Sequence, residues 1–410
     1  MTTDTPMSPR AAWLLILSAS AILMITMAAR LTTGLFLSPI NTSTGLGVAS
    51  ISLAMAVGQF MWGASQPVFG AVADKYGPAR VIVLGGVMLA LGLAATPFVS
   101  SQFGLMMTLG VLSAAGAGAG SFSILIGATA QRLPAERRPF AAGFINAGGS
   151  FGQFVFSPLV QIVIQASGWV VAMISLAATT LLTIPLAFLM RGQKAPAKAA
   201  AAVDETTLGR QVREALRDKS YLCLHAGFFT CGFHIAFLVT HLPGEVALCG
   251  LPAAVSAKAL GLIGLFNIAG SLIAGALGQR YRMKWLLAAI YGGRAVIIGL
   301  YLLAPKTALT FYLFAAALGF SWLATVPPTA GLVGKLFGTR YLSTLFGLTL
   351  LSHQVGGFFG AWLGGLAFVR FGDYSWMWYA DILLALAAAL VNLPIREARP
   401  HAPAAAAAKA

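Results

Sequence analysis

Long apolar runs separated by short polar segments fill most of the chain. The first run extends from Ala11 to Pro39 and contains a single charged residue, Arg30. A helix of about 20 apolar residues crosses a hydrocarbon layer of ~30 Å. Twelve runs reach this length, near residues 11–39, 48–73, 79–99, 103–131, 137–165, 169–191, 220–243, 254–279, 284–303, 307–335, 340–369 and 374–393. The pattern predicts an all-α polytopic membrane protein with twelve transmembrane helices.

Composition leads to the same class of protein. Of the 410 residues, 58% are hydrophobic and 9% are charged, and the mean hydropathy is +0.84. A soluble domain could not cover so much apolar surface. The first run has no small-residue cleavage site and is too long for a signal peptide, so we expect it to be retained. The cysteines Cys223, Cys231 and Cys249 form no metal or disulfide pattern, so we expect them to pack as small apolar residues and expect no cofactor.

The basic residues are distributed unevenly between the predicted loops. If both termini lie on one side of the membrane, that side receives 21 of the 26 Lys and Arg residues, and the other side receives Lys258, Lys306 and Arg370. Lys and Arg accumulate on the cytoplasmic side of membrane proteins. We therefore predict cytoplasmic termini and a bacterial inner membrane. The net charge of +15 is then a topology signal, and no nucleic-acid partner is expected.

Two stretches, 27–40 (MAARLTTGLFLSPI) and 232–244 (GFHIAFLVTHLPG), repeat one layout 204 residues apart. His234 takes the place of Arg30, and a proline lies near the end of each stretch. Two related halves with a substrate site between them are typical of secondary transporters. Within the segment that joins the halves, Leu208 to Leu216 is expected to form a short amphipathic helix. We divide the chain into a tail, a six-helix half, a linker, a second six-helix half and a second tail, at residues 1–10, 11–191, 192–219, 220–393 and 394–410.

The loop after the second run carries the most specific motif in the chain, GAVADKYGPAR. Gly70 permits close helix packing, Asp74 places an acceptor at the membrane edge, Gly77 turns the chain and Arg80 begins the third run. The motif resembles the loop 2–3 signature of the major facilitator superfamily, Gly-x-x-x-Asp-x-x-Gly-x-(+)-(+). The two residues after Gly77 depart from the usual basic pattern.

This resemblance covers about residues 10–395 and implies two pseudo-symmetric six-helix bundles that expose a site to each side of the membrane in turn. In the family the acid of the motif lies near the inner end of a second-half helix, so Asp74 is expected to stabilise a closed cytoplasmic side. The segments GLFLSPI and GFHIAFLVTHLP are similar to the group of monocarboxylate and oxalate:formate transporters. Those carriers place a basic residue in span 8 and sometimes in span 11. This chain has Asn267 and the pair His353-Gln354 there, so the roles are not transferred.

Polar residues inside the spans that line the cavity in this family are the candidates for a substrate site. Counting along the spans places Gln59, Asn146, His234 and Asn267 near the middle of the membrane, and Arg30, His241 and Gln354 nearer its outer face. Cationic and imidazole groups with almost no carboxylate favour an anion. His234 or His241 could carry a coupled proton, because histidine titrates near physiological pH. The competing interpretations are packing hydrogen bonds for the amides, carbonyl-bonded neutral histidines, and an Arg30 that extends to the membrane interface.

Two further charges, Arg294 and Asp381, lie inside spans 9 and 12. Counting residues inward places them at similar depths, and an unpaired charge near lipid is costly. We therefore predict a structural ion pair between them. The alternative interpretation makes Asp381 a proton carrier.

Taken together, these features predict a monomeric secondary transporter in the lipid bilayer that moves a small organic anion, a monocarboxylate, with protons. The chain shows no Ser-His-Asp set, paired carboxylates or metal-spaced cluster, so we do not expect an enzyme. One alternative is an exporter of amphiphilic drugs or toxicants. Another is a membrane sensor or scaffold that moves no substrate.

Overall fold

The computed structural model describes residues 8–191 and 207–397, and all regular elements in these ranges are helices. Most of the predicted tails and much of the predicted linker lie outside the described residues. The first half contains α1 (Pro9–Leu31), η1 (Thr33–Phe36), α2 (Leu37–Thr44), α3 (Val48–Tyr76), α4 (Pro78–Ala95), η2 (Thr96–Phe98), α5 (Gln102–Leu105), η3 (Met106–Ser113), α6 (Ala114–Ala119), α7 (Phe122–Ala130), η4 (Ala135–Arg137), α8 (Arg138–Ser167), α9 (Trp169–Thr180) and α10 (Thr183–Leu189). The second half contains α11 (Leu208–Ala215), α12 (Lys219–Leu248), α13 (Ala253–Arg280), α14 (Met283–Leu303), α15 (Ala308–Ser321), α16 (Val326–Phe337), α17 (Leu342–Phe371) and α18 (Ser375–Asn392).

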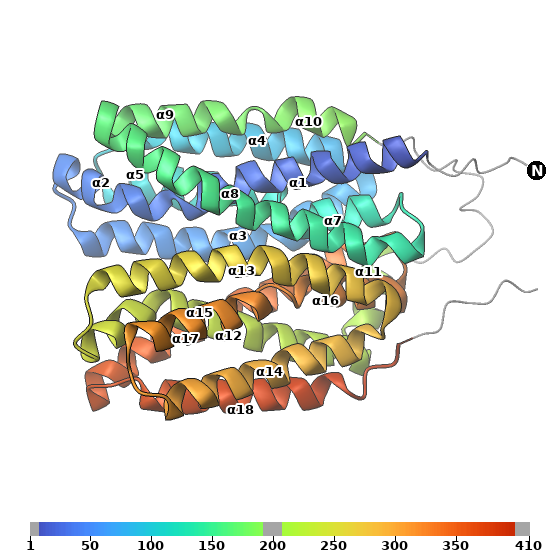
Figure 1. The fold of residues 1–410 in the computed structure, drawn as a ribbon. Coiled ribbons are helices and arrows are strands. Elements are labelled where there is room, and N and C mark those ends of the chain that lie inside the picture. Colours follow the sequence, from blue (N-terminus) through green and yellow to red (C-terminus); the bar gives the residue numbers. More distant parts are fainter. Residues whose placement is uncertain (1–7, 192–206, 398–410) are drawn as a thin grey trace, which may run out of the picture.

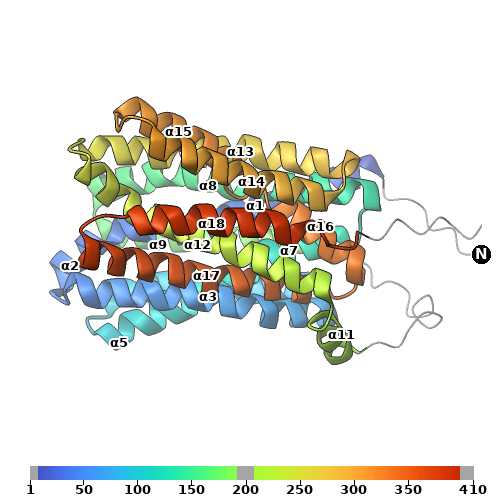
Figure 2. The ribbon, with the colours of Figure 1, turned by 90° about the horizontal axis from the view of Figure 1, so that it is seen from below.

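The long helices run side by side along one axis, and the chain turns at either end of the bundle (Figures 1 and 2). Grouped by these turns, the helices form twelve spans, some of them single helices and others chains of shorter ones. Within the described ranges, ten segments are long and apolar enough to cross a membrane. The other two spans, α3 and α17, pack against each other between the halves. The predicted twelve-helix architecture is confirmed.

The two halves form two layers in Figure 1, with the first half above the second. Across the boundary α8 packs against α13, and α17 packs against α3 and α7. Small residues allow this close approach. The Cα atom of Gly275 lies 2.9 Å from the position that a Cβ atom on Gly143 would occupy. In the same way, backbone atoms of Ser343 lie within 2.9 Å of the position that a Cβ atom on Gly70 would take.

Several spans are interrupted, and two of the interruptions lie beside candidate site residues. Span 1 changes from α1 to the short helix η1 directly after Arg30, where the Thr32 hydroxyl donates a hydrogen bond of 2.9 Å to the Ala28 carbonyl. Span 4 breaks at Gly120. Span 10 breaks between Ser321, the last residue of α15, and Val326, the first residue of α16. Two prolines follow Val326 in the first turn of α16, where a missing N–H group costs no helical hydrogen bond.

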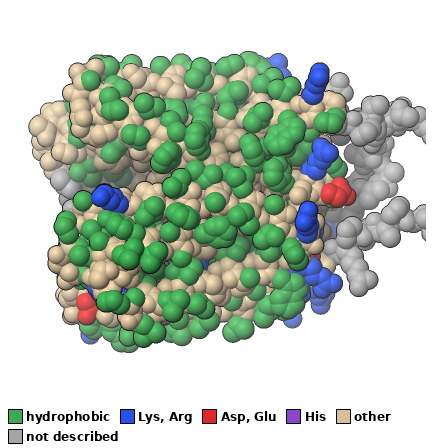
Figure 3. All heavy atoms as spheres, in the orientation of Figure 1, with side chains coloured by type: hydrophobic (Ala, Val, Ile, Leu, Met, Phe, Trp, Pro, Cys, Tyr) green, Lys and Arg blue, Asp and Glu red, His purple; other side chains and the backbone are tan. Residues whose placement is uncertain are grey.

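The surface has one basic end. Apolar side chains spread over the long face seen in Figure 3, whereas most of its Lys and Arg side chains lie at the end where the described chain begins and ends. We call this end, marked by Arg80, Arg137, Arg280 and Lys335, the basic end. Figure 3 also shows a recess between the halves at the opposite end.

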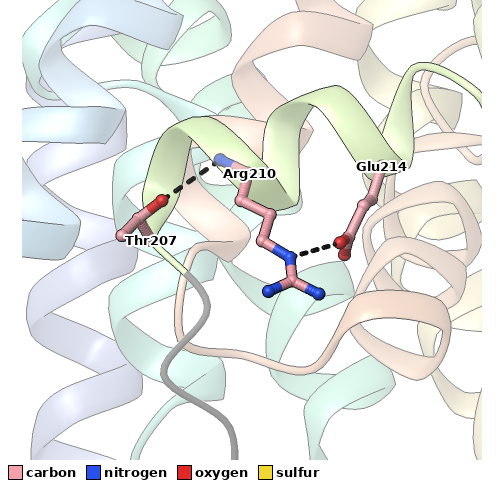
Figure 4. A network of polar contacts seen from close by, with 3 residues as sticks. All are labelled: Thr207, Arg210 and Glu214. Atoms are coloured by element: carbon pink, nitrogen blue, oxygen red, sulfur yellow. Dashed lines mark hydrogen bonds and ion pairs between the residues drawn. The ribbon is translucent and has the colours of Figure 1, made fainter.

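The predicted amphipathic helix of the linker region is α11, which lies at the basic end. Its N-terminus is capped by Thr207, whose hydroxyl accepts a hydrogen bond of 3.4 Å from the Arg210 backbone N–H (Figure 4). One turn later the Arg210 guanidinium lies 2.8 Å from Glu214 (Figure 4). The Gln211 side chain donates a hydrogen bond of 2.6 Å to the Phe337 carbonyl at the end of α16. The helix is therefore attached to the second half.

Candidate substrate-binding site

Arg30 lies in the last turn of α1, where the span changes direction. Its guanidinium carbon is 4.1 Å from the centroid of the Trp62 ring, and its Nη2 atom donates a hydrogen bond to the Gln59 side chain. The residue is half-buried. Among the described residues no carboxylate forms an ion pair with it. A cation held by an aromatic face and an amide keeps charge available for an anion.

Gln59 joins Arg30 to the second half. Its Nε2 atom donates a hydrogen bond of 2.7 Å to the Gln354 carbonyl oxygen on α17. The Gln354 side chain in turn lies 3.3 Å from Nδ1 of His353. The Gln354 side chain packs against Gly63. A Cβ atom on residue 63 would overlap it, so the glycine makes room for Gln354. We call Arg30, Gln59, Trp62 and Gln354 the arginine site.

Sequence reasoning named three of these four residues but missed Trp62. The signal was available, because Trp62 follows Gln59 by three residues and a helix presents such pairs on one face. His353 was noted only as a neighbour of Gln354. Its ring packs against Phe228, with centroids 5.2 Å apart, and the residue is 9% exposed.

Asn146 and Asn267 are buried between helices. They are 0% and 2% exposed, and their side chains are used in contacts between helices. Asn146 donates hydrogen bonds to the Ser271 hydroxyl (2.7 Å) and to the Leu323 carbonyl (3.0 Å). Asn267 donates to the Ser150 hydroxyl (2.6 Å) and accepts from the Leu323 backbone N–H (2.9 Å). Both amides therefore join the halves to the break in span 10, because buried polar atoms bond to their nearest partners.

The two candidate histidines also lie apart from the arginine site. The Nε2 atom of His241 is 2.8 Å from the Ala361 carbonyl on α17, and its ring packs against Tyr374 with centroids 5.2 Å apart. His234 is 1% exposed, and its Nε2 atom is 3.5 Å from Oδ1 of Asp381. The repeat therefore places His234 at a position equivalent to Arg30 but with different contacts.

The predicted ion pair between Arg294 and Asp381 is absent from this structure. The Nη2 atom of Arg294 donates hydrogen bonds to the carbonyls of Ser321 (2.5 Å) and Trp322 (2.6 Å). Asp381 has His234 as its neighbour instead. The reason is the break in span 10, which leaves carbonyl groups free at the end of α15, and such groups attract a cation.

The loop motif lies at the boundary between the halves. Oδ2 of Asp74 accepts hydrogen bonds from the backbone N–H (2.9 Å) and the hydroxyl (2.7 Å) of Thr344, in the first turn of α17. Oδ1 accepts a bond of 3.2 Å from Gln131, which also donates to the Arg340 carbonyl. Gly77 has φ +95° and caps the helix before the turn, and Arg80 is exposed on α4. Asp74 thus holds the basic ends of the two halves together.

Comparisons with known proteins give one consistent result. The family model described as Major Facilitator Superfamily matches residues 18–361. The oxalate:formate antiporter of Oxalobacter formigenes is 26% identical over 82% of this chain and 80% of its own length. Monocarboxylate transporter 13 of Bos taurus is 28% identical over 84% of this chain and 79% of its own length. The crystal structure of the E. coli fucose:proton symporter FucP superimposes with a TM-score of 0.73 at 15% identity, covering 94% of this chain and 98% of that one.

Proposed function

Because the chain belongs to the major facilitator superfamily, we propose that it is a secondary active transporter of a small organic anion, a monocarboxylate, coupled to protons. Family membership makes the protein a membrane transporter and not an enzyme. Substrate and coupling are our proposals. His234 and His241 are the candidates for the coupled proton, since histidine changes charge near physiological pH.

The observation that carries the proposal is the state of Arg30. It is half-buried between Trp62 and Gln59 and has no acidic partner among the described residues. A desolvated cation without a counter-ion attracts an anion. Gln59 and Gln354 reach the same place from opposite halves, so an anion bound there would contact both.

The names of the relatives support this substrate class. They are an oxalate:formate antiporter and monocarboxylate transporters, whose named substrates are small carboxylates. A planar guanidinium matches a carboxylate through two parallel hydrogen bonds. The amides of Gln59 and Gln354 can donate further hydrogen bonds to its oxygens.

We further propose that the protein works as a monomer in a bacterial inner membrane, with the basic end in the cytoplasm. The charge distribution supports this orientation (Figure 3). The state of the molecule would then be closed toward the cytoplasm, because the hydrogen bonds of Asp74, Gln131 and Gln279 across the halves lie at the basic end.

Transport by Arg30 variants tests the proposal. Purified protein in proteoliposomes would be assayed for uptake of radiolabelled formate, acetate, lactate and oxalate. Arg30→Lys loses the bidentate fork, and we expect about tenfold weaker apparent affinity. Arg30→Ala removes the charge, and we expect a loss of about 100-fold or more. Arg370→Lys is the matched control, since Arg370 is exposed near the end of α17.

Each alternative function has its own signature in this assay. Transport of uncharged amphiphiles at an equal rate by the wild type and Arg30→Ala would favour an exporter of drugs or toxicants. No transport of any compound by folded wild-type protein would favour a sensor or scaffold. If Arg30→Ala bound every transported carboxylate as tightly as the wild type, the assignment of Arg30 would be wrong.

A further inference from the structure

Three ionisable side chains lie together inside the second half, apart from the arginine site. They are His234 on α12, Arg294 on α14 and Asp381 on α18, and they are 1%, 1% and 0% exposed. Charged groups are rarely buried in this way unless each has a partner. The partners of each group therefore indicate which of the three side chains can be charged in this structure.

Arg294 has a partner that is not a carboxylate. Its Nη2 atom bonds to the carbonyls of Ser321 and Trp322, at the C-terminal end of α15. The free carbonyl groups at a helix C-terminus carry partial negative charge and stabilise a cation. Arg294 is thus compensated in part by the backbone, while its Nε and Nη1 atoms have no hydrogen-bond partner among the described residues.

Asp381 is left without such compensation. In the part of the chain that the structure describes, neither of its carboxylate oxygens accepts a hydrogen bond. Its ionisable neighbour is His234, with 3.5 Å between Nε2 and Oδ1, and both ring nitrogens of His234 also lack hydrogen-bond partners. This arrangement suits a carboxyl group that carries a proton, which a small movement would let it donate to the imidazole.

The surrounding helices add few charges to this pair. Arg294 faces it from α14. Tyr291 on the same helix lies against Arg294, with 5.3 Å from the guanidinium carbon to the ring centroid, and its hydroxyl donates a hydrogen bond of 2.6 Å to the Gly227 carbonyl. Cys231 lies one turn before His234 on α12, and His353 approaches Cys231 from α17. The break between α15 and α16 contributes backbone carbonyls and the hydroxyl of Thr325. Arg294 is therefore the main charge beside this pair.

We propose that Asp381, together with His234, is the proton-binding site of this transporter. This proposal rests on the proton coupling proposed above and selects His234 over His241. A proton taken from water on one side binds a carboxylate oxygen, whose O–H donates to Nε2 of His234. When the proton leaves to water on the other side, the carboxylate attracts Arg294, which gives up the carbonyls of α15.

The break in span 10 connects this exchange to the contact between the halves. Arg294 binds the carbonyl of Trp322, and Asn146 of the other half binds the carbonyl of Leu323, the next residue. A movement of Arg294 toward Asp381 therefore releases one of the side chains that hold the break. The state of the proton site then changes the stability of an interface that must open during transport.

A path of polar groups also leads from the arginine site to the cluster. Gln354 contacts His353, and His353 contacts Cys231. The thiol of Cys231 lies 3.4 Å from the Thr325 hydroxyl and 3.7 Å from the Trp322 carbonyl, which Arg294 also binds. Binding of an anion at Arg30 can thus influence the position of Arg294 through adjacent side chains.

The test separates exchange from proton-driven accumulation. Proteoliposomes would contain wild type, Asp381→Asn, Asp381→Glu or His234→Gln. Asp373→Asn is the control, because Asp373 is an exposed acid in the loop just before the helix that carries Asp381. Exchange of labelled for unlabelled carboxylate would be measured at equal pH, using whichever of formate, acetate, lactate or oxalate the wild type carries. Accumulation would be driven by a pH step, and an internal pH dye would report proton movement.

We expect Asp381→Asn to keep exchange within about threefold of wild type and to lose at least about tenfold in pH-driven accumulation, with no substrate-induced proton movement. Asp381→Glu should retain coupling, His234→Gln should shift its pH profile, and Asp373→Asn should behave as wild type. If Asp381→Asn does not fold, the expected shift in the pH profile of His234→Gln decides the question.

Three results would overturn the proposal. They are retained pH-driven accumulation in Asp381→Asn, loss of exchange in folded Asp381→Asn, and an unshifted pH profile in His234→Gln. Failure of the proposed function looks different, because the wild type itself would then lack exchange or pH-driven uptake.

Discussion

Replacing Asp74 by Asn should weaken the closure of the basic end. The carboxylate accepts two hydrogen bonds from Thr344, of 2.9 and 2.7 Å, and one of 3.2 Å from Gln131. Thr344 lies in the first turn of α17, where a negative charge stabilises the helix N-terminus. An Asn side chain keeps one carbonyl oxygen as an acceptor but loses the negative charge. Its N–H₂ group would face Gln131 or Thr344, which donate to Asp74 in the wild type.

The size of the effect follows from these contacts. A hydrogen bond to a charged group contributes about 1.5–3 kcal/mol and a neutral one about 1 kcal/mol. Asp74 is partly exposed, so solvent reduces this difference. We expect the closed state to lose about 1–2 kcal/mol relative to the open state, which changes the ratio of the two states roughly 5- to 30-fold.

Distances between spin labels measure this ratio directly. Labels at Tyr76 and Arg280, both exposed at the basic end on different halves, would report a longer distance when that end opens. Asp74→Asn should raise the long-distance population and reduce turnover, while substrate affinity stays within about threefold. An unchanged distance distribution, or a large loss of affinity with turnover retained, would refute the reasoning.

Three other substitutions test the packing around the two sites. Trp62→Ala should weaken anion affinity about 3- to 30-fold through loss of the aromatic face that holds Arg30, whereas Trp62→Phe should keep most of it, and uptake assays can compare the two. Gly232→Ala would place a Cβ atom into the His353 carbonyl, so we expect the melting temperature in detergent to fall and Ala236→Gly, on the same helix, to have the smaller effect. Gly143→Leu would overlap the backbone of Gly275, so it should raise the open population in the distance measurement, and a compact closed state in this variant would contradict the packing argument.

The sequence predicted the helices, because a long apolar run has few alternatives in a membrane. It also predicted Gln59 near the middle of its span, and Arg30 and Gln354 nearer the outer face. It could not predict that these residues meet, because depth along a helix does not fix its rotation. The separation of His234 from the arginine site could not be predicted either, because it also depends on the rotation of the helix.

The contacts of Arg294 show a second kind of limit. Its depth matched that of Asp381, and the cost of a lone charge near lipid is real. The structure instead pairs Arg294 with backbone carbonyls at the break in span 10. Free carbonyl groups cannot be predicted from a pattern of side chains. The contacts of Asn146 and Asn267 could not be predicted for the same reason, since both bond to that break.

The glycine contacts between the halves have a consequence for the speed of transport. At Gly143 and Gly275, and at Gly347 beside Pro67, the two halves meet through backbone surfaces instead of interlocking side chains. Surfaces without interlocking side chains can slide without forcing rotamers through eclipsed angles. Friction between the halves should therefore be low, and the activation barrier should be concentrated in the few hydrogen bonds that break during each cycle. A transporter built in this way can be slowed or accelerated by single polar substitutions at its seam, with little change in the fold of either half.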